Sequence, residues 1–194
     1  MSLAPWRSAI ALALNENSNL AYARYLQLAT VRVNGLPANR TLVFRGFLEN
    51  TNQFKFITDS RTEKIEQIQQ QPWAEACWYF PNTREQFRIT GTLNLVSDNE
   101  QHDLASARIT TWQELSDAAR LQFAWPSSGQ PRNKDEQAAF SPPQPDSSQP
   151  LPNFCLLLLE PVQVDHLVLR GEPQNRWIYY HDEQNGWTSQ EINP

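Results

Sequence analysis

The chain has 194 residues, of which 40% are hydrophobic, and its formal net charge is −5. These values are typical of one acidic globular domain, and we expect residues 1–194 to form a single domain. A net acidic chain is a poor partner for nucleic acid, and no apolar segment has the length of a membrane span, so we expect a cytoplasmic protein that binds neither.

The first 59 residues predict one helix followed by three strands. Apolar residues recur at helical spacing over residues 5–15, and the polar stretch NENSN follows them. Residues 25–59 contain three apolar runs separated by NGLP and ENTN, which have the composition of tight turns. This pattern predicts an antiparallel meander.

A short helix is predicted next, before two more strands. Ser60 could cap this helix with Glu63 three positions on, as in a capping box, and Pro72 ends it. Residues 74–80 and 85–97 then return to the alternation of apolar and polar side chains that is typical of strands.

The second half of the chain predicts a helix, a loop and further strands. Residues 99–123 are helical in pattern, whereas residues 126–152 are rich in Pro, Ser and Gln and predict a surface loop. Residues 154–169 and 176–192 predict two or three strands, and the run FCLLLL suits a strand buried on both faces, such as one at a subunit interface. The predicted fold class is mainly β, an antiparallel closed or split barrel with flanking helices.

Cysteines and histidines are too scattered to predict a metal site. Cys77 and Cys155 lie far apart in predicted strands, and His102, His166 and His181 do not have the spacing of metal ligands. We therefore expect two unreactive core thiols and no bound metal.

Two arginines stand at the ends of the segment NRTLVFRGF, residues 39–47. Because side chains alternate along a strand, Arg45 shares one face with Thr41 and Val43, whereas Arg40 points to the other face. They cannot form one basic patch, but they could contact the two ends of an elongated ligand. The alternative is that both arginines are solvated or pair with acidic residues.

Hydroxyls and cations gather at the start of the helix predicted after residue 59. Thr58, Ser60 and Thr62 flank Arg61 and Lys64, and a helix N-terminus presents free N–H groups. This arrangement suits a phosphate, although an ordinary capped helix with solvated charges would have the same residues. No glycine-rich dinucleotide motif is present, so a mononucleotide fits better.

Three motifs in this order resemble the flavin-binding core of the pyridoxamine 5′-phosphate oxidase family. They are NRTLVFRGF, FKFITDSRTEK and WYFPNTREQFRITG, within residues 20–96. The resemblance implies an FMN-binding split β-barrel of a divergent branch, which works as a homodimer with FMN at the interface. The FMN contacts that it implies are Arg40, Thr41, Leu42, Val43, Arg45, Ile57, Thr58, Arg61, Thr62, Lys64 and Gln86. In this assignment Arg40, Lys64 and Arg61 hold the phosphate, Arg45 lies near the ring, and Gln86 contacts the polar edge of the isoalloxazine.

The C-terminal strand departs from the pattern of typical family members. Arg176 can stand for an arginine that contacts the substrate, but Ile178 and Tyr180 occupy the places of a substrate-binding histidine and a flavin-binding arginine. FMN binding is therefore better supported than oxidation of a vitamin B6 phosphate.

The resemblance implies an FMN-dependent oxidoreductase acting on a small molecule, namely the oxidation of pyridoxamine or pyridoxine 5′-phosphate by O2. Because the flavin carries out the hydride chemistry, the sequence does not identify a catalytic acid or nucleophile. Two alternatives remain open: a flavin reductase or flavin carrier with another substrate, and a split-barrel interaction protein without a cofactor.

Overall fold

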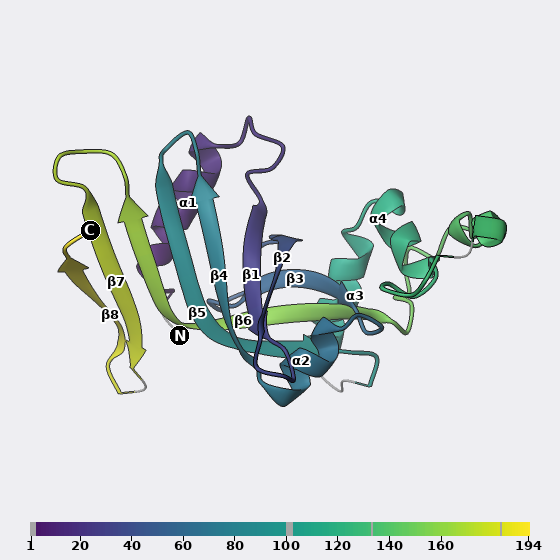
Figure 1. Ribbon diagram of the computed structural model, residues 1–194. Coiled ribbons are helices and arrows are strands. Elements are labelled where there is room, and N and C mark those ends of the chain that lie inside the picture. Colours follow the sequence, from purple (N-terminus) through teal and green to yellow (C-terminus); the bar gives the residue numbers. More distant parts are fainter. Residues whose placement is uncertain (1–2, 100–102, 133, 183) are drawn as a thin grey trace.

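The computed structural model describes residues 3–99, 103–132, 134–182 and 184–194 (Figure 1). The strands are β1 (Tyr25–Val31), β2 (Pro37–Val43), β3 (Phe54–Asp59), β4 (Trp73–Phe80), β5 (Glu85–Val96), β6 (Phe154–Val168), β7 (Asn175–Asp182) and β8 (Gly186–Ile192). The helices are α1 (Trp6–Glu16), α2 (Lys64–Gln70), α3 (Asp103–Gln113), α4 (Asp117–Leu121), and the 3₁₀ turns η1 (Gln122–Ala124) and η2 (Lys134–Phe140). No helix among these residues is long and apolar enough to cross a membrane.

The strands form one antiparallel sheet, so the predicted mainly-β fold with flanking helices is confirmed. The strand order is β2-β1-β4-β5-β6-β7-β8, and β3 pairs with β6 outside this path. Strands β1 and β2 form the predicted hairpin, in which Gly35 turns the chain with a φ of 81°. Figure 1 shows the long strand β6 running from the end of the molecule that carries α3 and α4 back to β7.

The predicted meander is wrong for its third strand. Strand β3 pairs with the first residues of β6, from Phe54 opposite Leu159 to Asp59 opposite Phe154, and only one isolated bridge joins Phe47 to Phe54. The chain leaves β2 at Val43 and bends at Gly46, whose φ is 104°. Glycine adopts this backbone conformation without the steric cost of a side chain, so the bend directs β3 to another partner.

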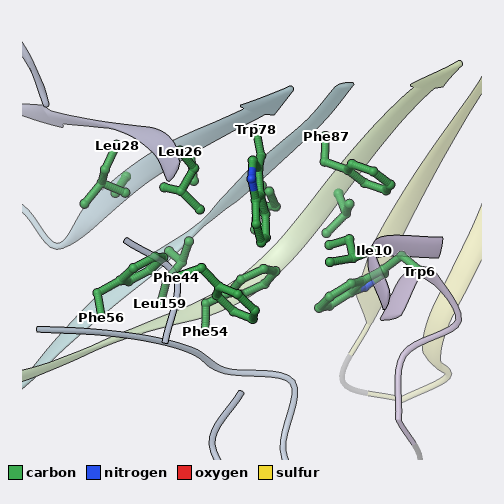
Figure 2. Packing of buried hydrophobic residues seen from close by; sticks show 14 of the residues in the cluster. Trp6, Ile10, Leu26, Leu28, Phe44, Phe54, Phe56, Trp78, Phe87 and Leu159 are labelled. Atoms are coloured by element: carbon green, nitrogen blue, oxygen red, sulfur yellow. The ribbon is translucent and has the colours of Figure 1, made fainter. Parts of the chain in front are cut away.

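The core lies on one face of the sheet and is rich in aromatic rings (Figure 2). Trp6 of α1 stacks on Phe54 of β3 with ring centroids 5.4 Å apart, and the Trp78 indole N–H donates a hydrogen bond to the Ala23 carbonyl at 2.9 Å. Helix α1 turns its apolar stripe to this face, since Trp6, Ile10 and Ala13 are all buried.

The opposite face of the sheet, here called the outer face, carries exposed apolar side chains among polar ones. Directly paired residues on neighbouring strands point to the same side of the sheet, so the strand register identifies the residues of the outer face. They include Tyr25, Val31, Trp73, Glu75, Cys77, Tyr79, Gln86, Arg88, Asp165, Arg176, Ile178 and Tyr180.

Strand β6 is buried on both faces at residues 154–159, as the run FCLLLL predicted. However, the second face is covered by this chain and not by a subunit interface. Leu156 and Leu158 pack against Leu104 and Ala107 of α3, and Phe154 packs against Trp112. The predicted subunit contact at this strand is therefore wrong, because the chain's own helix supplies the apolar cover.

Two helix predictions need correction. Helix α2 begins at Lys64 and not at Ser60, because Asp59 accepts from the Arg61 backbone N–H at 2.8 Å and folds residues 60–63 into a turn. The helix predicted over residues 99–123 is broken into α3, α4 and η1, and Ser116 caps α4 by accepting from the Ala119 N–H at 3.3 Å. Residues 100–102 lie outside the described structure.

A tight approach between β5 and β6 predicts that Gly91→Ala destabilises the protein. A Cβ atom at Gly91 would lie 2.0 Å from the Glu160 carbonyl oxygen, at the irregularity in the pairing of the two strands. We expect the free energy of unfolding to fall by at least about 2 kcal/mol, because backbone atoms must move to admit the methyl group. Denaturant unfolding measures this loss, and Asn94→Ala at an exposed position of the same strand is the control. Equal stability of both variants would contradict the expected clash.

Candidate functional site

One pocket collects most of the residues that the sequence assigns to a ligand. Its cavity volume is about 660 Å³, within the range of small-molecule and cofactor sites. The predicted residues that line it are Thr41, Leu42, Val43, Arg45, Ile57, Thr58, Arg61 and Lys64. They come from β2 and the residues just after it, from the end of β3 and from the start of α2.

Lys64 lines the pocket and has hydroxyl partners. Its ammonium group donates hydrogen bonds to the hydroxyl oxygens of Thr58 at 2.9 Å and Thr62 at 3.0 Å. Burial lowers the pKa of Lys64, and repulsion from Arg40 lowers it further. An anion placed beside this ammonium group would relieve both effects.

Arg40 lies behind Lys64, outside the lining of the pocket. Its guanidinium donates to the Thr30 hydroxyl at 2.6 Å, to the Gln67 amide oxygen at 2.9 Å and to the Leu28 carbonyl at 3.2 Å. These contacts tie β2 to β1 and α2. Arg45 lines the pocket and Arg40 does not.

Arg45 is half-buried with part of its hydrogen-bonding capacity unused. Its Nε has no partner among the described residues, and burial lowers its pKa, with a further contribution from the nearby Arg24. Arg45 also lines a second hollow of about 280 Å³ together with Arg24 and Glu114. Arg45 thus lines both cavities and carries a buried N–H that has no partner among the described residues.

Arg61 reaches the pocket but has protein partners. Its guanidinium forms an ion pair with the carboxylate of Asp59, with Nη2 2.6 Å from Oδ2. It also donates hydrogen bonds to the carbonyl oxygens of Trp125 at 2.9 Å and Phe123 at 3.2 Å. Burial would raise the pKa of Asp59, but hydrogen bonds from Arg61 and Asn153 outweigh it and lower that pKa.

Gln86 and Arg176 lie apart from the pocket, on the outer face. Both are paired to Leu167 of β6, one from β5 and one from β7. Arg176 forms two hydrogen bonds with Asp165, at 3.0 and 2.7 Å, and Arg88 binds the same carboxylate. Within one chain, Gln86 and Arg176 therefore lie away from the other residues that were predicted to contact FMN.

A wall of the pocket was missed from the sequence, because most of it lies at the end of the helix predicted over residues 99–123 and in the loop predicted over residues 126–152. The added lining residues are Asp59, Ala119, Gln122, Phe123, Trp125, Pro126, Ser127, Ser128, Gly129, Gln130, Arg132 and Phe140. The aromatic rings of Trp125 and Phe140 lie 6.3 Å apart. Two aromatic residues within an otherwise polar segment were the available signal.

The remaining reactive side chains lie elsewhere. Cys155 is buried, and burial raises its pKa to about 11, so the thiol stays protonated. Burial also raises the pKa of Cys77. Across residues that the structure describes, no group of three or more His, Cys, Asp or Glu side chains could hold a metal ion.

Comparison with known proteins gives a family model that matches the first half of the chain and a relative that matches its full length. A family model described as pyridoxamine 5′-phosphate oxidase, FMN-binding domain, matches residues 3–97. Pyridoxine/pyridoxamine 5′-phosphate oxidase 2 of Arabidopsis thaliana is 39% identical over 198 residues, which cover 99% of this chain and 98% of that protein.

Solved structures agree with this relationship. The crystal structure of a pyridoxamine 5′-phosphate oxidase-related, FMN binding protein from Nostoc punctiforme PCC 73102 has a TM-score of 0.96 and 69% identity, covering 100% of both chains. PhzG from Burkholderia lata 383, in complex with tetrahydrophenazine-1-carboxylic acid, has a TM-score of 0.79, covers 100% of this chain and 94% of its own, and at 19% identity shows the shared fold alone. By sequence and by structure, this chain belongs to the pyridoxamine 5′-phosphate oxidase family.

Proposed function

We propose that this chain binds FMN in the pocket and oxidises pyridoxamine or pyridoxine 5′-phosphate, with O2 as the electron acceptor. The observation that carries the proposal is the arrangement of cations along the pocket. Lys64, bonded to hydroxyls, lines the pocket from the start of α2, and Arg45 lines it from the residues just after β2. The full-length relative from Arabidopsis thaliana, named for this activity, supports the choice of substrate.

The surroundings of Lys64 fit the phosphate of FMN. A phosphate needs a cation and hydrogen-bond donors, and the ammonium of Lys64 with the hydroxyl of Thr58 would supply both, whereas the Thr62 hydroxyl donates to the Asp59 carbonyl at 2.8 Å. Arg40 adds positive charge close behind Lys64. Because no carboxylate of the described residues bonds to Lys64, its charge remains available to the ligand.

The lining from β2 and Arg45 fits the flavin ring. Residues 41–43 supply the edge of β2, with the apolar side chains of Leu42 and Val43, and Arg45 adds a positive charge to the lining. When bound, FMN would accept a hydride from the substrate and return the electron pair to O2, giving hydrogen peroxide. Arg45 would stabilise the negative charge that the ring gains, while Trp125 and Phe140 would exclude water.

We propose that a second copy of the chain completes the site. Gln86 and Arg176 lie together on the outer face, away from this chain's own pocket. The same face exposes Tyr25, Val31, Trp73, Tyr79 and Tyr180. A sheet face with this many exposed apolar side chains is typical of an interface, and a two-fold dimer would carry each Gln86 toward the partner's pocket.

A second candidate function is flavin-dependent chemistry on another small substrate. The C-terminal strand favours it, because Arg176 is held by Asp165 and Ile178 occupies the place of the histidine expected in a typical vitamin B6 phosphate oxidase. In this case FMN would bind as proposed, and the substrate would differ.

Mixing the purified protein with pyridoxamine 5′-phosphate separates these functions. We expect a yellow protein, or one that turns yellow with added FMN, whose flavin absorbance bleaches when the substrate is added without O2. Readmitted O2 should restore the absorbance and release hydrogen peroxide. Unbleached bound flavin would support the second candidate, and failure to take up FMN would exclude both and leave the cofactor-free alternative.

A further inference from the structure

Asp59, Arg61 and Asn153 form a hydrogen-bonded network beside the pocket, here called the Arg61 network. Asn153 donates from Nδ2 to Asp59 Oδ2 at 2.7 Å and to the Phe123 carbonyl at 2.9 Å. The Asn153 carbonyl in turn accepts from the Ser60 N–H at 2.9 Å. The network therefore joins the end of β3 to the segment before β6 and to the residues that follow α4.

The geometry of Arg61 leaves little for a ligand. An arginine has five N–H donors. Nε donates to both oxygens of Asp59 at 2.9 and 3.1 Å, Nη2 donates to Asp59 and Phe123, and Nη1 donates to Trp125. One N–H of Nη1 is the remaining donor. The paired carboxylate also cancels most of the positive charge that Arg61 could present to a phosphate.

Lys64 differs from Arg61 in its hydrogen-bond partners. Its partners are neutral hydroxyls, and the Asp59 carboxylate acts on its pKa through charge and not through a hydrogen bond among the described residues. The two cations stand three residues apart and both line the pocket, yet one is occupied by the protein and the other is open to an anion.

The groups that Arg61 holds are backbone carbonyls of the pocket wall. Phe123 and Trp125 lie at the point where η1 ends and residues 125–130 begin to line the cavity. Residues 126–130 are exposed and have no helix or strand of their own, so this end of the wall is held by the Arg61 network together with the packing of Phe123 against Trp112 and Phe154.

We propose that Arg61 is a positioning residue that holds the wall formed by residues 123–130 over the pocket and slows release of a bound flavin, without selecting for its phosphate. This inference rests on the flavin binding proposed above. It replaces the direct phosphate contact that the sequence motif suggested for Arg61.

The affinities of FMN and riboflavin, which lacks the phosphate, test the proposal. With Arg61→Ala we expect both flavins to bind at least about tenfold more weakly and to dissociate faster, so that their affinity ratio stays unchanged. Arg61→Lys should behave in the same way, because one ammonium group cannot reach Asp59 and two carbonyls together. Flavin fluorescence titration and stopped-flow dilution measure affinity and release.

Asp59→Asn separates positioning from phosphate binding most sharply. If Asp59 merely restrained a phosphate-binding Arg61, this variant would bind FMN more tightly than the unaltered protein. We expect the opposite, weaker binding of both flavins, because the wall loses its anchor. Selective loss of FMN binding in Arg61→Ala, or retained FMN binding in Arg61→Lys, would overturn the proposal.

Hydrogen–deuterium exchange of the flavin-free protein gives a readout that needs no cofactor. Amides of residues 122–130 should exchange faster in Arg61→Ala and Asp59→Asn than in the unaltered protein, while the strands of the sheet remain protected. Unchanged exchange in this segment would refute the positioning role. An unaltered protein that binds no flavin would refute the proposed function instead, and the exchange comparison would still decide the role of Arg61.

Discussion

Replacing Lys64 by methionine is expected to weaken FMN binding about ten- to hundredfold and to leave riboflavin binding nearly unchanged. A hydrogen bond to a charged group is worth about 1.5–3 kcal/mol, and each 1.4 kcal/mol corresponds to a tenfold change in affinity. Lys64 is the lining cation whose partners are hydroxyls and not a carboxylate. Flavin titration of the flavin-free protein measures both affinities.

The chain offers a matched control for this change in Lys55. Lys55 lies in β3, whereas Lys64 begins α2; it is not among the residues that line the pocket, and its ammonium group is 3.5 Å from Glu114. Lys55→Met removes the same charge and should preserve the preference for FMN over riboflavin. If both lysine variants lose that preference equally, overall charge and not a phosphate contact at Lys64 would explain FMN recognition.

Local sequence patterns predicted where the helices and strands lie better than they predicted which strands pair with each other. The alternation in residues 85–97 and the glycine turn at Gly35 are local signals, and β5 and the β1–β2 hairpin form as expected. The pairing of β3 with β6 joins residues 54–59 to residues 154–159, and no local signal specifies a partner so far along the chain. Similarly, the capping pattern at Ser60 was overridden by the bonds between Asp59 and Arg61.

The candidate site shows the same difference between residues placed by local sequence patterns and residues placed by contacts between distant segments. Residues of β2, β3 and the start of α2 meet in one pocket because they are close in sequence or on facing elements, and the motifs predicted them. The wall around Trp125 could not be predicted, because its position depends on side chains at Asp59, Arg61 and Asn153 that are distant in sequence. Composition described this segment only as polar and proline-rich.

Introducing a carboxylate at Tyr79 is expected to dissociate the proposed dimer and to abolish tight FMN binding with it. Tyr79 is 45% exposed on the outer face and pairs directly with Gln86. Tyr79→Glu would bury two unpaired charges in a two-fold interface, so we expect the dimer to weaken at least about a hundredfold. Sedimentation velocity measures the oligomeric state, and flavin titration of the same samples measures FMN affinity.

Leu12→Glu is the control, because Leu12 is 60% exposed on α1, which packs against the other face of the sheet. It adds the same charge at an exposed apolar position and should leave both the dimer and FMN binding intact. The link between assembly and cofactor has a physical reason: a monomer keeps Lys64 and Arg45 at its own pocket but leaves Gln86 and Arg176 on the outer face without a ligand to contact. A Tyr79→Glu monomer that binds FMN as tightly as the unaltered protein would show that one chain suffices, and Gln86 would then have no place in the site.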